Sequence, residues 1–271
     1  MKIGTKKFDI GSRTFIVGVL NVTPDSFSDG GSHNDPDRAV AHAEKLIKEG
    51  ADIIEVGGES TRPGHIPVDE QDELRRVLPV VQALKKTTDT PIAVDTRKAA
   101  VAEAVLKAGA DLINDVMCFK EDLELAQVCA KHGAVCCITH NRDSGEYTNL
   151  LLDIISDLES GIEILVKAGV SPTNIIVDPG IGFAKDADQS MTVLRNLFTF
   201  AQMPYPLMLG ASRKSFIGHT LGFPIDERLE PTLATTAFGI THGIDFVRVH
   251  DVAQNKKVAM MTDEFVRYRH G

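Results

Sequence analysis

The chain has 271 residues and a formal net charge of -9, with 43% of its residues hydrophobic and 25% charged. This length allows one or two domains, and the negative balance argues against a surface that binds nucleic acid. We therefore expect no nucleic-acid partner. No apolar run reaches the ~18 residues of a membrane span, and none follows the first lysines as a secretory signal would, so we also expect no membrane partner and a cytoplasmic location.

Eight short apolar runs, rich in Val, Ile and Leu, predict strands of the kind that parallel sheets cover on both faces. In chain order these runs are 15–20, 53–56, 91–94, 112–113, 134–138, 175–177, 206–209 and 246–249. The predicted helices between them are 37–49, 69–86, 98–108, 122–132, 153–168, 187–201 and 231–242. Strand and helix therefore alternate along the whole chain.

A recurring junction separates helix from strand. Lys or His stands one or two residues before a glycine at Gly50, Gly109, Gly133 and Gly243. Glycine can take the left-handed conformation that ends a helix, and a neighbouring cation complements the helix dipole. The junction therefore marks the boundary of a repeating unit.

Eight strand and helix units predict one α/β domain over residues 1–271, folded as a (β/α)8 TIM barrel. Alternating residues in 2–15 predict an N-terminal β-hairpin that plugs the amino end of the barrel. An open, doubly wound sheet is the alternative, because periodicity alone does not prove closure.

Cysteine spacing predicts neither a disulfide framework nor a zinc site. The four cysteines are Cys118, Cys129, Cys136 and Cys137, and two of them are adjacent in a predicted buried strand. We therefore expect reduced thiols in the core.

Six polar residues stand at or just beyond the carboxyl ends of predicted strands. They are Asn21, Asp95, Asn114, Asp178, Arg248 and His250. In a parallel barrel these ends converge on one face, where the active site lies. The placement therefore predicts an enzyme.

Cations near the same ends predict an anion site. They are Arg62, Arg213, Lys214, Arg248 and His250. Loops after the last two strands of a barrel often hold phosphate, and Ser212 and Ser215 offer hydroxyls there. Arg213 and Lys214 alone would be an ordinary solvated pair, but these neighbours favour anion binding.

Asp95, Asn114 and Asp178 indicate a different chemistry. Carboxylates and an amide in one pocket match the edge of a heterocycle that bears N–H donors and a carbonyl acceptor. The alternative is that each residue only caps a helix or begins a turn. Three polar strand ends in one barrel favour the pocket.

Seven ordered segments resemble the dihydropteroate synthases of the pterin-binding family. The segments are 21–31 (NVTPDSFSDGG), 56–64 (VGGESTRPG), 94–96 (VDT), 113–115 (IND), 178–183 (DPGIGF), 212–218 (SRKSFIG) and 248–252 (RVHDV). The resemblance implies that 6-hydroxymethyl-7,8-dihydropterin diphosphate condenses with 4-aminobenzoate to give dihydropteroate and diphosphate. It also implies Mg²⁺ as cofactor and a homodimer.

The resemblance assigns the pterin and diphosphate to residues that match the family's motifs. Asp95, Asn114, Asp178 and Lys214 would bind the pterin, and Arg248 would reach between ring and diphosphate. His250 and Asn21 would serve the diphosphate, with Asn21 also binding its magnesium. Asp95, Asp178, Lys214, Arg248, His250 and Asp29 are the implied catalytic residues.

The aminobenzoate would meet a second group of residues. Thr61, Arg62, Pro63, Phe183, Lys214 and Ser215 would border it. Asp25, Phe27, Ser28 and Asp29 lie on a first loop that would close over the reacting centre, with Phe27 against the aminobenzoate ring.

Departures from the family's pattern remove none of these residues. Glu55 stands where Asp is usual, Thr139 where Met is common, and Arg97 follows Thr96 where Tyr or Thr is usual. His140 and Arg142 have either a role in loop structure or a contact with substrate. Two other functions stay open: a methyltransferase that serves a corrinoid, and a paralogue that binds pterin without turnover.

Overall fold

The structure, a computed structural model, describes residues 1–22, 36–59 and 68–267. One parallel sheet contains eight strands. They are β3 (Phe15–Asn21), β4 (Ile53–Gly57), β5 (Ile92–Asp95), β6 (Leu112–Asp115), β7 (Val135–Thr139), β8 (Ile175–Asp178), β9 (Met208–Leu209) and β10 (Phe246–Val249). Every one of them begins and ends within two residues of a predicted run.

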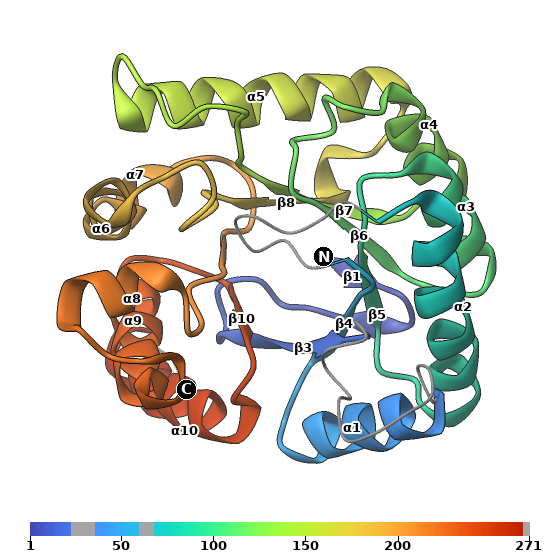
Figure 1. Ribbon diagram of the computed structural model, residues 1–271, viewed down its shortest axis with the longest axis horizontal. Coiled ribbons are helices and arrows are strands. Elements are labelled where there is room, and N and C mark those ends of the chain that lie inside the picture. The colour runs from blue at the N-terminus through green and yellow to red at the C-terminus, as the bar shows by residue number, and fades with distance from the viewer. Residues whose placement is uncertain (23–35, 60–67, 268–271) are drawn as a thin grey trace.

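The sheet closes on itself. Its strand order is β8-β7-β6-β5-β4-β3-β10-β9, and an isolated parallel bridge between Val177 and Leu207 joins the two ends. The Val177 N–H donates to the Pro206 carbonyl at 3.0 Å across this seam. In Figure 1 the strands form a ring, with the helices around its outside. The predicted TIM barrel is confirmed, and the open doubly wound sheet is wrong.

Helices follow the strands in alternation. They are α1 (Pro36–Lys48), α2 (Glu70–Thr87), α3 (Ala99–Lys107), α4 (Leu123–His132), α5 (Leu150–Ala168), α6 (Ala187–Arg195), α7 (Leu197–Phe200), α8 (Ser215–Leu221), α9 (Leu229–Thr241) and α10 (Val252–Val266). The single helix predicted over 187–201 is two helices, because the Asn196 side chain bonds back to the Thr192 carbonyl where the first one ends. Over the described ranges, no helix has the length and apolar character needed to cross a membrane.

Local chemistry fixes the ends of these helices. The side chains of Asp69, Asp122 and Asp186 accept backbone N–H groups in the first turns of α2, α4 and α6. At the other ends, the four predicted junction glycines all have positive φ, between 64° and 107°. The junction prediction is therefore confirmed.

The N-terminal hairpin closes the amino end of the barrel, as predicted. It consists of β1 (Lys2–Ile3) paired antiparallel with β2 (Lys6–Lys7). Ile3 and Phe8 pack in the inner core with Phe15 and Phe246, and the Phe8 ring lies 4.9 Å from the Phe15 ring. Figure 1 places β1 and the N-terminus inside the ring. The interior is therefore apolar at this end, which leaves the carboxyl ends of the strands for polar groups.

Candidate active site

Four of the predicted polar residues point into the barrel at the carboxyl ends of its strands. Asp95, Asn114, Asp178 and Arg248 each stand two positions after a residue of the inner apolar core. Since side chains alternate along a strand, these four face the same interior. The ladder pairs Asp95 with Asn114 directly, so the first two are neighbours. The predicted convergence of these residues is what the structure shows.

Arg248 forms a buried ion pair at the centre of this face. Its Nη2 donates to Asp178 Oδ2 at 2.9 Å, and Nη1 reaches Glu55 Oε2 at 3.5 Å. The other Asp178 oxygen accepts the Gly180 N–H at 2.8 Å. A Cβ on Gly210 would stand 2.7 Å from Arg248 Nη2, so glycine leaves room for the guanidinium. Burial opposes the charge of Arg248, but the opposite charges of Glu55 and Asp178 outweigh it, raise the pKa of Arg248 and keep it charged.

Glu55 and Asp95 bring further carboxylates to the same place. Glu55 is 4% exposed, and burial raises its pKa above the ordinary range. Burial and the nearby Glu55 charge raise the pKa of Asp95 to about 8. A protonated Asp95 at neutral pH relieves the repulsion between neighbouring acids. The face therefore holds a proton that a ligand can use or displace.

Asn114 presents an unused donor. Its side chain is fully buried, its Oδ1 accepts the Thr139 hydroxyl at 3.0 Å, and its Nδ2 has no hydrogen-bond partner. An unpaired buried amide is costly unless a ligand completes it. Asn114 is therefore aimed at an acceptor that comes with the substrate.

Lys214 and Phe183 form the wall beside these acids. The Lys214 ammonium lies 4.0 Å from the centre of the Phe183 ring and donates to the Ile181 carbonyl. Burial lowers the pKa of Lys214 to about 7, against the opposing effect of the Asp178 charge. This pair offers a ring face and a cation in one place.

His250 and Ser215 stand at the exposed rim. The His250 ring Nδ1 is 3.0 Å from the Ser212 hydroxyl, so these two side chains form one polar group. Ser215 is the first residue of α8. Both are placed where an anion outside the group of buried polar residues could reach them.

Arg213 does not share the anion site that the sequence predicted for it and Lys214. Its guanidinium forms two hydrogen bonds to Asp251, at 2.8 Å and 2.7 Å, and its backbone has a φ of 55°. The chain turns sharply there, so adjacent cations point to different partners. Arg213 fixes the turn, and Lys214 faces the site.

Asn21 ends β3 beside Gly57. A Cβ on Gly57 would stand 3.4 Å from Asn21 Oδ1, so this oxygen lies next to Gly57 at van der Waals distance. Within the described part of the chain, no group of three or more His, Cys, Asp or Glu side chains could hold a metal. A single amide oxygen fits Mg²⁺ that keeps waters and takes its other ligands from substrate phosphate.

Several predicted site residues lie outside the described ranges. They are Asp25, Phe27, Ser28, Asp29, Thr61, Arg62 and Pro63. Their roles stay predictions.

Two buried groups lie behind the site: the sequence did not point to Lys185, and it left the role of His140 open. Lys185 is 9% exposed and His140 is fully buried, and their Nζ and Nδ1 atoms are 2.8 Å apart. Burial lowers the pKa of Lys185 to about 7 and that of His140 to about 3. Arg142 bonds to Asp157 and to the Glu146 carbonyl, which is the structural role left open for it. The one signal in the sequence that could have identified Lys185 was its position just beyond a Gly-rich strand end.

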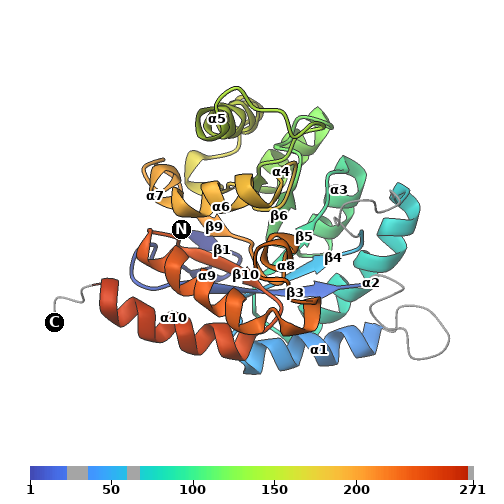
Figure 2. The same cartoon turned by 60° about the vertical axis from the view of Figure 1, so that its left-hand side comes forward.

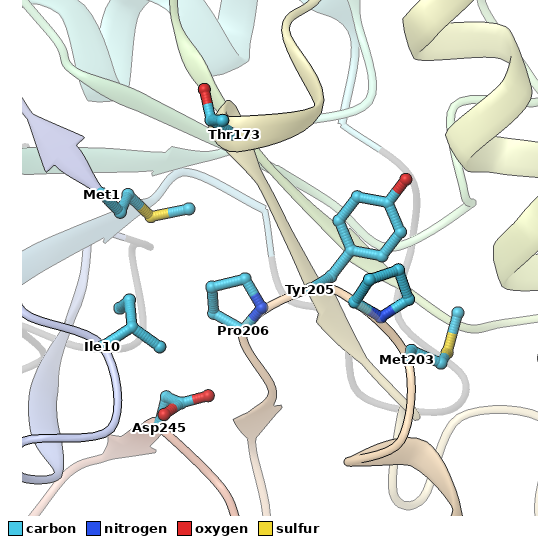
Figure 3. Close-up of a pocket in the computed structure, with 8 residues that line it drawn as sticks. Met1, Ile10, Thr173, Met203, Tyr205, Pro206 and Asp245 are labelled. Atoms are coloured by element: carbon cyan, nitrogen blue, oxygen red, sulfur yellow. The ribbon is translucent and has the colours of Figure 1, made fainter.

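A separate hollow of about 410 Å³ lies at the amino end of the barrel (Figure 3). Met1, Ile10, Tyr205 and Pro206 line it, with Asp245 at its edge. Thr173 also lines it, and none of the polar strand-end residues of the carboxyl face belongs to its lining.

Comparisons with known proteins agree with this geometry. Residues 17–250 match the family model described as pterin binding enzyme. A dihydropteroate synthase of Clostridium beijerinckii is 53% identical over 98% of this chain and 100% of its own length, and one of Bacillus subtilis is 48% identical over 93% and 88%.

Solved structures give the same result. A dihydropteroate synthase of Clostridium difficile in the presence of pteroic acid has a TM-score of 0.94 and 49% identity, covering 97% of this chain and 100% of that one. A Yersinia pestis dihydropteroate synthase with a sulfonamide complex has a TM-score of 0.91 and 38% identity, covering 98% of both chains. The chain belongs to the pterin-binding enzyme family.

Proposed function

We propose that the chain catalyses the dihydropteroate synthase reaction in folate biosynthesis. It condenses 6-hydroxymethyl-7,8-dihydropterin diphosphate with 4-aminobenzoate and releases diphosphate. The observation that carries this proposal is the buried set of Asp178, Arg248 and the unpartnered Asn114 amide at the carboxyl face. It offers acceptors, a fixed cation and one free donor to a planar heterocycle.

Pterin recognition uses the buried polar groups. The carboxylates of Asp178 and Asp95 accept ring N–H groups, and Asn114 Nδ2 donates to a ring acceptor. Because Arg248 already holds one Asp178 oxygen, the acceptor geometry is fixed before the ligand arrives. Lys214 adds a donor beside the ring.

Departure of diphosphate is the step that needs cations. Arg248 and the rim residue His250 stabilise the growing negative charge, and Asn21 would hold Mg²⁺ beside it. When bound, the metal neutralises phosphate charge and so makes diphosphate a better leaving group. The pterin cation that remains is stabilised by the negative charge of Asp178 in a site of low dielectric, and Asp95 adds a second negative charge once it gives up its proton.

The arylamine then captures the pterin cation. It is a weak nucleophile, so its position and the exclusion of water matter more than a strong base. Phe183, Lys214 and Ser215 form the described part of the wall that borders it. We place Thr61, Arg62, Pro63, Phe27 and Asp29 in the remaining part.

One assay separates this function from its alternatives. Purified protein with pterin diphosphate and Mg²⁺ should release diphosphate only when 4-aminobenzoate is added, and dihydropteroate should appear in equal amount. A corrinoid methyltransferase would instead consume methyltetrahydrofolate, and a non-catalytic paralogue would bind pterin without release. Diphosphate release that ignores 4-aminobenzoate would contradict the proposal.

We place the reaction in the cytoplasm, where reduced thiols such as the four buried cysteines are the ordinary state.

We infer that two copies of the chain form a homodimer. Large apolar side chains stand exposed on α9 and α10, which lie side by side (Figure 2). They include Phe238, Met260, Met261 and Phe265, the last of them 69% exposed. Exposed apolar groups of this kind mark association surfaces.

A charge on this surface should separate the copies. Phe265→Glu should lower the mass measured by sedimentation from twice 29.4 kDa to 29.4 kDa. Phe198→Glu, at an equally exposed position on α7, is the matched control and should stay dimeric. A monomeric wild type would refute the dimer.

Asp178→Asn should lose affinity for pterin diphosphate. One Asp178 oxygen accepts from Gly180 and the other from Arg248, so an amide must turn an NH₂ group against one of these donors. The expected penalty is ~1 to 3 kcal/mol or more, measured by calorimetry. Asp245→Asn, at a buried carboxylate at the amino end, is the control and should leave the affinity unchanged. Equal affinity in both variants would remove Asp178 from the pterin site.

The charge of Asp95 should make stability depend on pH in a defined direction. Its pKa is raised to about 8 in the folded protein, whereas an unfolded aspartate titrates near ~3.9. The folded state binds the extra proton across this interval, so the free energy of unfolding should fall as pH rises from about 4 to about 8.

Asp95→Asn removes that proton and should flatten the fall, so the variant gains stability over wild type as pH rises. Urea unfolding at several pH values measures this. Asp143→Asn, at an exposed carboxylate, is the control and should follow wild type. Parallel curves for wild type and Asp95→Asn would show that the acid is not buried as described.

A further inference from the structure

The loop between β8 and α6, residues 179–186, is held by side chains that the reaction does not use. Lys185 Nζ donates to the carbonyls of Gly180 and Phe183, both at 3.0 Å, and to His140 Nδ1 at 2.8 Å. The Tyr147 hydroxyl donates to the Ala184 carbonyl at 3.0 Å. This loop forms few backbone hydrogen bonds of its own, so these side-chain hydrogen bonds hold it in place.

The hydrogen-bond roles are fixed by the neighbouring acid. His140 Nε2 lies 3.0 Å from Asp157 Oδ2, and Asp157 also accepts from Lys120 and Arg142. A carboxylate in this position only accepts, so Nε2 carries the proton and Nδ1 is an acceptor. Lys185 must then donate to three acceptors, which requires its ammonium form.

The same loop closely approaches β7. A Cβ on Gly180 would stand 1.9 Å from the His140 carbonyl oxygen, and Gly180 has a φ of 69°. The loop therefore lies directly on the end of β7, and Lys185 bonds to residues on both sides of this contact. Movement of the loop would break these bonds together.

The loop carries the wall of the amine side. Phe183 lies under the Lys214 ammonium, and Ile181 supplies the carbonyl that this ammonium contacts. Asp178 is also held by Arg248, which does not belong to the loop. Displacing the loop would thus move Phe183 more than Asp178 or Lys214, whose backbone belongs to the start of α8.

We propose that Lys185 is a positioning residue for the amine side of the site. Through the carbonyls of Gly180 and Phe183 it sets where the Phe183 ring stands. The proposal rests on the function proposed above, because it assigns this wall to 4-aminobenzoate. Loss of Lys185 should therefore weaken the binding of 4-aminobenzoate more than the binding of pterin diphosphate.

The test is a comparison of Michaelis constants in the intact enzyme. Lys185→Met keeps the side-chain length and removes all three donors. We expect the Michaelis constant for 4-aminobenzoate to rise roughly ten- to hundred-fold, as for a displaced binding wall. The Michaelis constant for pterin diphosphate should change less than about three-fold. Lys167→Met, at an exposed lysine on α5, is the matched control and should leave both constants unchanged.

Tyr147→Phe is the milder second variant, in case Lys185→Met does not fold. It removes one donor to the same loop and should raise the 4-aminobenzoate constant less, again without the pterin effect. Wild-type turnover that requires 4-aminobenzoate establishes the reaction first. With that in hand, equal losses for both substrates, or an unchanged 4-aminobenzoate constant in both loop variants, would overturn the positioning role alone.

Discussion

The buried guanidinium of Arg248 is the constraint on which the carboxyl face depends. A charge taken out of water is costly unless paired and hydrogen-bonded, and Arg248 has Asp178 and Glu55 for this purpose. Gly210 provides the space, and the inner apolar core lies two positions down the same strand. Barrel closure brings β4, β8 and β10 close enough for the three side chains to meet. The ion pair therefore depends on the closed barrel.

The balance of charge around this pair determines what the face can bind. Three acids, Glu55, Asp95 and Asp178, stand with two cations, Arg248 and Lys214, and burial raises the pKa of Glu55 and of Asp95. A neutral heterocycle with donors can enter without adding charge. The anionic part of a substrate must remain nearer the rim, where His250 stands. Such a division suits a ligand with a planar polar end and a phosphate end.

Strand positions and strand-end chemistry could be predicted from the sequence because both depend on local patterns. Short apolar runs predicted all eight strands, and polar residues at or directly after their ends predicted Asp95, Asn114, Asp178 and Arg248. Contacts across the barrel could not be predicted, because they depend on side-chain direction. The turn at Arg213 is one example: it separates two adjacent cations that looked like a pair. The hydrogen bonds of Lys185, His140 and Tyr147 behind the site could not be predicted for the same reason, since these residues come from separate parts of the chain.

Four carbonyls of the 179–186 loop already accept hydrogen bonds. Lys185 occupies those of Gly180 and Phe183, Lys214 that of Ile181, and Tyr147 that of Ala184. A molecule that approaches these four carbonyls finds them already engaged, whereas the Phe183 ring offers it an apolar surface of contact. Selectivity here must come from the thickness and outline of an aromatic ring. Compounds that differ only in donors directed at the loop should therefore be poorly distinguished, whereas a change in ring shape meets the wall directly.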